Sequence, residues 1–172
     1  RNVGNLKKNS GRYGYKMNLV ICMAGLNTRF HDVGFDIPKY LLPWKDKTII
    51  YEILKTFTIN YKFNNILLIA HQRDIYFKDQ LANVIAPLNL SYENLYYIGD
   101  TQGQADTASV GAKLFENNKY GLCIHNADTI ISGINFNQIE ELLQTNDAFI
   151  DIFTANSKKS VSYTHLRAHE TV

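Results

Sequence analysis

The sequence has 172 residues, of which 45% are hydrophobic, 12% aromatic and 20% charged. This composition is typical of one globular domain with a core of its own, and it excludes an intrinsically disordered chain. No apolar run approaches the roughly 20 residues that a helix needs to cross a bilayer, so we expect no membrane-spanning segment.

The net charge of +2 averages three unlike segments. Residues 1–16 carry five basic and no acidic side chains, residues 17–157 carry ten basic and fifteen acidic ones, and residues 158–172 carry three basic and one acidic. The acidic centre disfavours nucleic-acid binding through a basic face. We expect residues 1–16 to be a disordered leader or added sequence, and residues 158–172 to be a tail unrelated to the domain.

Between these ends, apolar strand-like runs alternate with amphipathic helices. The expected strands are residues 18–23, 65–70, 95–99, 120–128 and 148–155, and the expected helices are residues 47–60, 73–85, 105–117 and 136–146. In the first helix Ile49, Ile53, Leu54 and Phe57 share one face, and in the second Ile75, Leu81 and Ile85 point inward. The alternation predicts an α/β fold, Rossmann-like, with three α/β/α layers and a mostly parallel sheet.

The two cysteines, Cys22 and Cys123, both lie inside apolar strand-like runs. We interpret them as two buried free thiols rather than as a disulfide. Free thiols are typical of a reducing compartment, so we expect a cytoplasmic protein.

Functional residues are expected where strands end, because ligands of such sheets bind at the carboxyl ends of the strands. After the first strand, Gly25 lets the backbone turn and approach a ligand, and Arg29 offers a fork of donors that suits phosphate oxygens. Lys39 lies between Pro38 and Pro43, which restrict where its ammonium can reach. Each feature alone also fits an ordinary turn or a solvent-facing lysine.

The strand at residues 120–128 ends in Asp128, whose carboxylate is expected at the carboxyl edge of the sheet. One hard oxygen ligand at that edge suits Mg²⁺, which is usually shared with phosphates, although a helix cap or turn aspartate is the alternative. His125 lies inside the same strand, and we interpret it as a core histidine rather than as a ligand.

The motifs "MAGLNTRF", "DIPKYLLPW", "QGQADTA" and "NAD", in this order, resemble the sugar-phosphate nucleotidyltransferases, also called nucleoside-diphosphate-sugar pyrophosphorylases. The resemblance covers residues 17–157 and is sharpest over residues 17–44. It departs from the family pattern at Asn27, where a second glycine is usual, and at Gln104, where a threonine is common. Asp106 adds a nearby charge, which we interpret as the favourable start of a helix.

The resemblance implies a role for each matching residue. The triphosphate would be wrapped by Ala24, Gly25, Leu26, Asn27 and Thr28, while Arg29 would bind the phosphates and stabilise charge as pyrophosphate leaves. Lys39 would contact the α-phosphate, Gln102 and Gly103 would lie against the base, and Asp128 would ligate Mg²⁺.

The implied reaction joins a nucleoside triphosphate and a sugar 1-phosphate, or a similar phosphate monoester, and supplies precursors of surface glycans. Family members run beyond 200 residues and hold most of the acceptor pocket in their second half. The chain is therefore expected to be the nucleotide-binding part, inactive by itself. A non-catalytic nucleotide-binding module remains the alternative. A dinucleotide-binding oxidoreductase is disfavoured, since the loop has one glycine and residues 70–72 provide no acid.

Overall fold

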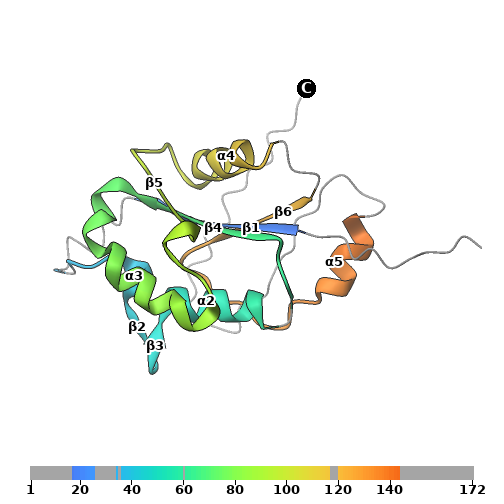
Figure 1. Cartoon of the computed structure of the whole chain (residues 1–172), viewed down its shortest axis with the longest axis horizontal. Helices are drawn as coiled ribbons and strands as arrows, with labels where there is room; N and C mark the ends of the chain where they lie inside the picture. Colours follow the sequence, from blue (N-terminus) through green and yellow to red (C-terminus); the bar gives the residue numbers. More distant parts are fainter. Residues whose placement is uncertain (1–16, 26–33, 35, 60, 117–119, 144–172) are drawn as a thin grey trace, which may run out of the picture.

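The structure is a computed structural model that describes residues 17–25, 34, 36–59, 61–116 and 120–143. Its centre is a parallel sheet with the strand order β5-β4-β1-β6 and helices on both faces (Figure 1). The strands are β1 Met17–Met23, β4 Asn65–His71, β5 Leu95–Ile98 and β6 Gly121–Asn126. The predicted α/β, Rossmann-like fold with three layers is confirmed.

Strand β1 lies in the middle of the sheet, and all seven of its residues are buried. A strand with neighbours on both edges and helices on both faces needs apolar side chains on each side. Accordingly, Leu19, Ile21 and Met23 belong to the large core cluster, whereas Val20 and Cys22 pack in a second cluster on the opposite face. The uninterrupted apolar run of the sequence is thus explained by two cores.

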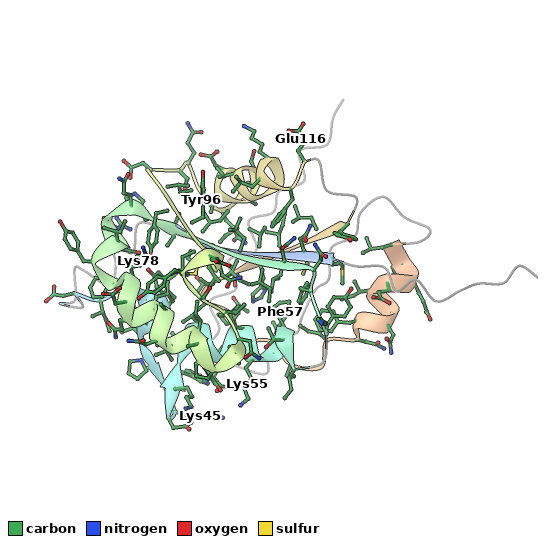
Figure 2. The ribbon with its side chains drawn as sticks, viewed as in Figure 1. Lys45, Lys55, Phe57, Lys78, Tyr96 and Glu116 are labelled. Carbon is green, nitrogen blue, oxygen red and sulfur yellow. The ribbon has the colours of Figure 1, made fainter. Side chains whose placement is uncertain are left out.

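The two helical layers cover opposite faces of the sheet, with α2 and α3 on one side and α4 on the other (Figure 1). The helices are α2 Ile49–Thr58, α3 Lys78–Ile85, α4 Gln104–Leu114 and α5 Phe136–Leu143. Helix α2 buries Ile53, Leu54 and Phe57 as predicted, and Figure 2 shows Phe57 between the helix and the sheet. Ile49, predicted on the same face, is only partly buried, and Ile50 is buried instead.

Helix α2 begins two residues later than predicted. Lys47–Thr48 forms a short strand, β3, which pairs antiparallel with β2, Pro43–Trp44. Thr48 then caps the helix, since its hydroxyl accepts a hydrogen bond of 3.4 Å from the Tyr51 N–H.

The expected helix over residues 73–85 is wrong in its first half. Gln72–Phe77 forms a 3₁₀ helix, η2, and the α-helix begins at Lys78. Leu81 and Ile85 are fully buried, but Ile75 is 43% exposed rather than inward. A 3₁₀ helix has three residues per turn, so the 3.6-residue period that predicted an inward Ile75 does not extend through η2.

Smaller differences concern where elements end. Strand β6 stops at Asn126, so Asp128 lies in the turn that follows the strand. The expected helices over residues 105–117 and 136–146 correspond to α4 and α5, with residues 117 and 144–146 outside the described residues. The expected leader, the strand over residues 148–155 and the tail also lie outside them. None of the described helices is both long and apolar enough to cross a bilayer.

Cys22 and Cys123 are both free, as expected. Burial raises the pKa of the Cys22 thiol to about 11 and that of the Cys123 thiol to about 12. Both thiols are therefore protonated at neutral pH, and neither is a reactive nucleophile.

Gly111 sets how closely α4 approaches the sheet. A Cβ atom at this position would lie 2.8 Å and 2.9 Å from the two methyl carbons of Val20, in the middle of the buried strand. We expect Gly111→Ala to lower the free energy of unfolding by about 1 kcal/mol, because overpacking costs about 1–3 kcal/mol while alanine gains about 1 kcal/mol of helix propensity.

Chemical denaturation of the 172-residue chain measures this effect. Ser109→Ala is the matched control, since Ser109 is exposed on the same helix and gains helix propensity without meeting the sheet. Equal stability of Gly111→Ala and Ser109→Ala would contradict a close approach of α4 to β1.

Candidate functional site

The candidate site lies at the carboxyl ends of β1 and β6. The chain leaves β1 toward β4 and β5 on one side and later returns to β6 on the other side. Connections that diverge in this way leave a crevice between the two strands. A pocket of about 330 Å³ occupies this position, lined by Cys22, Met23, Ala24, Gly25, Lys39, Thr101, Gln102, Gly103, Gln104, Thr107, Asn126, Ala127 and Asp128.

Six of the residues predicted from the sequence line this pocket together. They come from four separate segments of the chain, and they are Ala24, Gly25, Lys39, Gln102, Gly103 and Asp128. The other four, Leu26, Asn27, Thr28 and Arg29, lie outside the described residues. The individual roles of all ten residues stay predictions.

Lys39 and Asp128 form an ion pair at the pocket although 89 residues separate them, with 2.7 Å between Lys39 Nζ and Asp128 Oδ2. Lys39 opens the 3₁₀ helix η1, Lys39–Leu41, directly after Pro38. The lysine side chain is 23% exposed and the aspartate side chain is 48% exposed. A pair this exposed contributes little stability, so either partner can exchange its contact for a ligand.

His125 holds the turn that carries Asp128. Its Nε2 lies 2.8 Å from the Thr129 carbonyl oxygen, which only accepts, so Nε2 is the donor. The ring packs against Phe57 with 4.9 Å between ring centroids, and burial lowers the pKa of His125. The histidine is therefore neutral at pH 7. It has a hydrogen-bond partner, as predicted, but it is half-buried rather than enclosed in the core.

The turn at Gln102 and Gly103, which is closed by hydrogen bonds, also lines the pocket. Gly103 has φ +138°, a backbone conformation that favours glycine, and its carbonyl accepts a hydrogen bond from the Thr107 N–H. The Asp106 carboxylate accepts from the Gln102 N–H at 3.1 Å. Asp106 lies in the first turn of α4, as expected for an acid at a helix start.

The backbone of Gly25 lies beside open space. A Cβ atom there would meet none of the described residues within 4 Å, and φ is outside the left-handed range. A glycine at this position is thus not required by the local fold of the described residues. It instead lets a ligand come close to the backbone of the pocket wall.

Asn126 and Arg73 were not among the site residues predicted from the sequence. Asn126 lines the pocket, and its buried Oδ1 has no hydrogen-bond partner among the described residues. Arg73, after β4, donates from its guanidinium to the Gly25 carbonyl oxygen at 2.7 Å. The position of Asn126 at a strand end is a signal that sequence reasoning could have used, whereas the contact of Arg73 depends on tertiary placement.

The pocket suits a magnesium ion only if a ligand supplies further oxygens. No three His, Cys, Asp or Glu side chains gather into a metal-binding group within the part of the chain that the structure describes. Asp128 does present an accessible carboxylate at the pocket. One carboxylate shared with substrate phosphates is the usual protein contribution to Mg²⁺, so the donor set fits this ion.

Comparisons with known proteins identify the fold. No protein-family model and no curated protein matches the sequence. Among solved structures, a nucleoside-diphosphate-sugar pyrophosphorylase from Vibrio cholerae matches with 24% identity and a TM-score of 0.52, over 70% of this chain and 51% of that one. A UDP-glucose pyrophosphorylase complexed with UDP-glucose matches with 20% identity and a TM-score of 0.50, over 75% of this chain and 53% of that one.

The described part of the chain therefore has the fold of a sugar-phosphate nucleotidyltransferase, which agrees with the resemblance of its motifs. The chain spans about half the length of these two structures.

Proposed function

We propose that this chain is the nucleotide-binding part of a nucleotidyltransferase. The reaction transfers a nucleoside monophosphate from a nucleoside triphosphate to a sugar 1-phosphate or a similar phosphate monoester. The observation that carries the proposal is the Lys39–Asp128 ion pair, which lies at the switch-point pocket together with the backbone of Gly25 and the turn at Gly103. A cation and a carboxylate beside open backbone are the groups that a metal-bound polyphosphate needs.

The negative charge of the reacting phosphates determines what the protein must supply. An oxygen of the acceptor phosphate attacks the α-phosphorus, a new P–O bond forms, and the bond to the bridging oxygen breaks so that pyrophosphate leaves with the electron pair. Such a transfer needs little covalent help, but it needs stabilisation of the negative charge that builds up on the phosphates. Lys39 would supply positive charge at the α-phosphate, and Arg29 would do the same for the leaving pyrophosphate.

The turn at Gln102 and Gly103 would contact the base, and Asn126 would offer a buried acceptor to a donor of the nucleoside. Asp128 would hold Mg²⁺, which when bound neutralises phosphate charge. The ion pair with Lys39 would then be replaced, which leaves the lysine free to contact the α-phosphate.

The acceptor is proposed from the fold neighbours, one of which is complexed with UDP-glucose. A nucleotide-activated sugar of this kind is a precursor of glycans, so we place the product in surface-glycan synthesis.

Calorimetric titration of the 172-residue chain tests the proposal, with ATP, CTP, GTP, UTP and dTTP each added with and without Mg²⁺. We expect one triphosphate to bind best and to bind more tightly with the metal, which would also name the base. Pyrophosphate release on addition of sugar 1-phosphates tests turnover. Failure of a folded chain to bind any triphosphate would overturn the proposal.

Asp128→Asn tests the metal role. We expect the gain in triphosphate affinity on adding Mg²⁺ to fall by about tenfold or more, because an amide is a far weaker Mg²⁺ ligand than a carboxylate. Asp79→Asn is the matched control, since Asp79 is exposed and accepts a hydrogen bond from the Tyr92 hydroxyl rather than pairing with Lys39. An unchanged magnesium titration for Asp128→Asn would assign the metal to another ligand.

A non-catalytic nucleotide-binding module is the second candidate. Tight triphosphate binding without pyrophosphate release, for every acceptor supplied, would support it.

A further inference from the structure

A chain of contacts connects two segments that line the pocket, one at Gly25 and the other at Lys39. It starts at Arg73, whose terminal guanidinium nitrogen donates to the Gly25 carbonyl oxygen at 2.7 Å. Arg73 Nε lies 3.6 Å from Asp74 Oδ1, and Asp74 Oδ2 accepts a hydrogen bond of 3.1 Å from the Tyr40 hydroxyl. Tyr40 is the neighbour of Lys39 in η1, so the contacts run from the Gly25 backbone to the lysine.

The middle of this chain of contacts is rigid. Tyr40 is fully buried and Asp74 is 5% exposed. Burial also raises the pKa of Asp74, against the opposing effects of the Tyr40 hydroxyl and the Arg73 guanidinium. A buried carboxyl group that loses its partners costs much more than a surface one, so these contacts are not easily exchanged.

A third contact fixes Arg73 from the strand side. The Arg73 N–H donates to His71 Nδ1 at 3.1 Å, which places the proton of the ring on Nε2 facing the Asp100 carboxylate at 2.9 Å. This hydrogen bond fixes the start of the 3₁₀ helix η2 at the end of β4. From η2, Arg73 contacts Gly25 and Asp74 contacts Tyr40.

We propose that Arg73 and Asp74 are positioning residues that set the Gly25 backbone and Lys39 in register with each other for one polyphosphate ligand. Arg73 satisfies the Gly25 carbonyl, whose partial negative charge would otherwise be unpaired beside a polyanion. Asp74 holds Tyr40 and so fixes the start of the Lys39 side chain. The inference rests on the proposed function, because it assumes that the pocket takes a nucleoside triphosphate.

Variants of the 172-residue chain separate positioning from folding. Arg73→Met should weaken binding of the preferred triphosphate about tenfold by calorimetry, the usual effect of losing a hydrogen bond with a charged partner. Binding of the matching nucleoside, which has no phosphate, should stay unchanged in ligand-observed NMR. Arg73→Lys should restore part of the loss, since it keeps a positive donor.

Tyr40→Phe tests the contact of Asp74 with the Lys39 segment. We expect a loss of about threefold to tenfold in triphosphate affinity. Tyr97→Phe is its matched control, because the buried Tyr97 hydroxyl has no hydrogen-bond partner among the described residues. The Arg73→Met/Tyr40→Phe double variant should lose less than the product of the two single losses, since both act through Asp74.

Three results would each overturn the inference. They are parallel losses of triphosphate and nucleoside affinity, independent effects in the double variant, and a loss in Tyr97→Phe equal to that in Tyr40→Phe. Thermal unfolding of each variant checks the fold. Failure of the unmodified chain to bind any triphosphate would instead refute the proposed function, and the positioning role with it.

Discussion

Lys39→Ala is expected to slow pyrophosphate release at least about a hundredfold, the size typical of losing a charge contact that matters most in the transition state. The substitution has a second consequence, because it leaves Asp128 without its partner at 2.7 Å. An unpaired carboxylate beside the pocket repels the triphosphate. We therefore expect weaker triphosphate binding without Mg²⁺ and recovery of much of that loss when the metal is added.

Lys55→Ala is the matched control for this prediction. Lys55, labelled on α2 in Figure 2, also pairs with an acid, Glu52, and neither residue lines the pocket. The Lys39→Ala/Asp128→Asn double variant should bind the metal-free triphosphate better than Lys39→Ala does. The proposed role of Lys39 is wrong if Lys39→Ala turns over at the normal rate. Where the unmodified chain binds the triphosphate without turnover, equally tight binding by Lys39→Ala would contradict the role instead.

Strand β1 was predictable because it is buried along its whole length. A central parallel strand is covered on both faces, so residues 19–23 form an unbroken apolar run. Strands β5 and β6 are only partly buried, and they were predicted from short apolar runs between expected helices. The pair β2 and β3 was missed because each strand has two residues, too few to show any period. Segment η2 was predicted as α-helix because its residues suit an α-helix as well as a 3₁₀ helix. Which of the two forms depends on the tertiary contacts of Arg73 and Asp74.

Some residues of the site could be placed from strand order, whereas others depend on tertiary packing. Asp128 and Gly25 follow neighbouring parallel strands, so strand order alone brings them to one edge. Lys39 comes from a loop, and its contact with Asp128 depends on the packing of Tyr40 beneath it, which no local pattern encodes. The motif resemblance, rather than periodicity, selected this lysine.

Gly103 should be the least replaceable glycine of the pocket. Its φ of +138° and ψ of −171° lie in a region that is essentially restricted to glycine, and a residue forced there costs about 1–3 kcal/mol. No atom of the described residues lies within 4 Å of a Cβ built at this position, so the cost of Gly103→Ala is backbone strain and not a clash. The turn can relieve the strain only by rotating the peptides that face the ligand.

We therefore expect Gly103→Ala to weaken triphosphate and nucleoside binding alike, by about tenfold to a hundredfold, which corresponds to strain of this size. That pattern differs from Arg73→Met, where only triphosphate binding is expected to weaken, because Gly103 is proposed to contact the base. Gly99→Ala is the control, since it has the same open space and φ outside the left-handed range. Normal affinity in Gly103→Ala, at unchanged thermal stability, would mean that the ligand does not use this turn and that the base lies elsewhere.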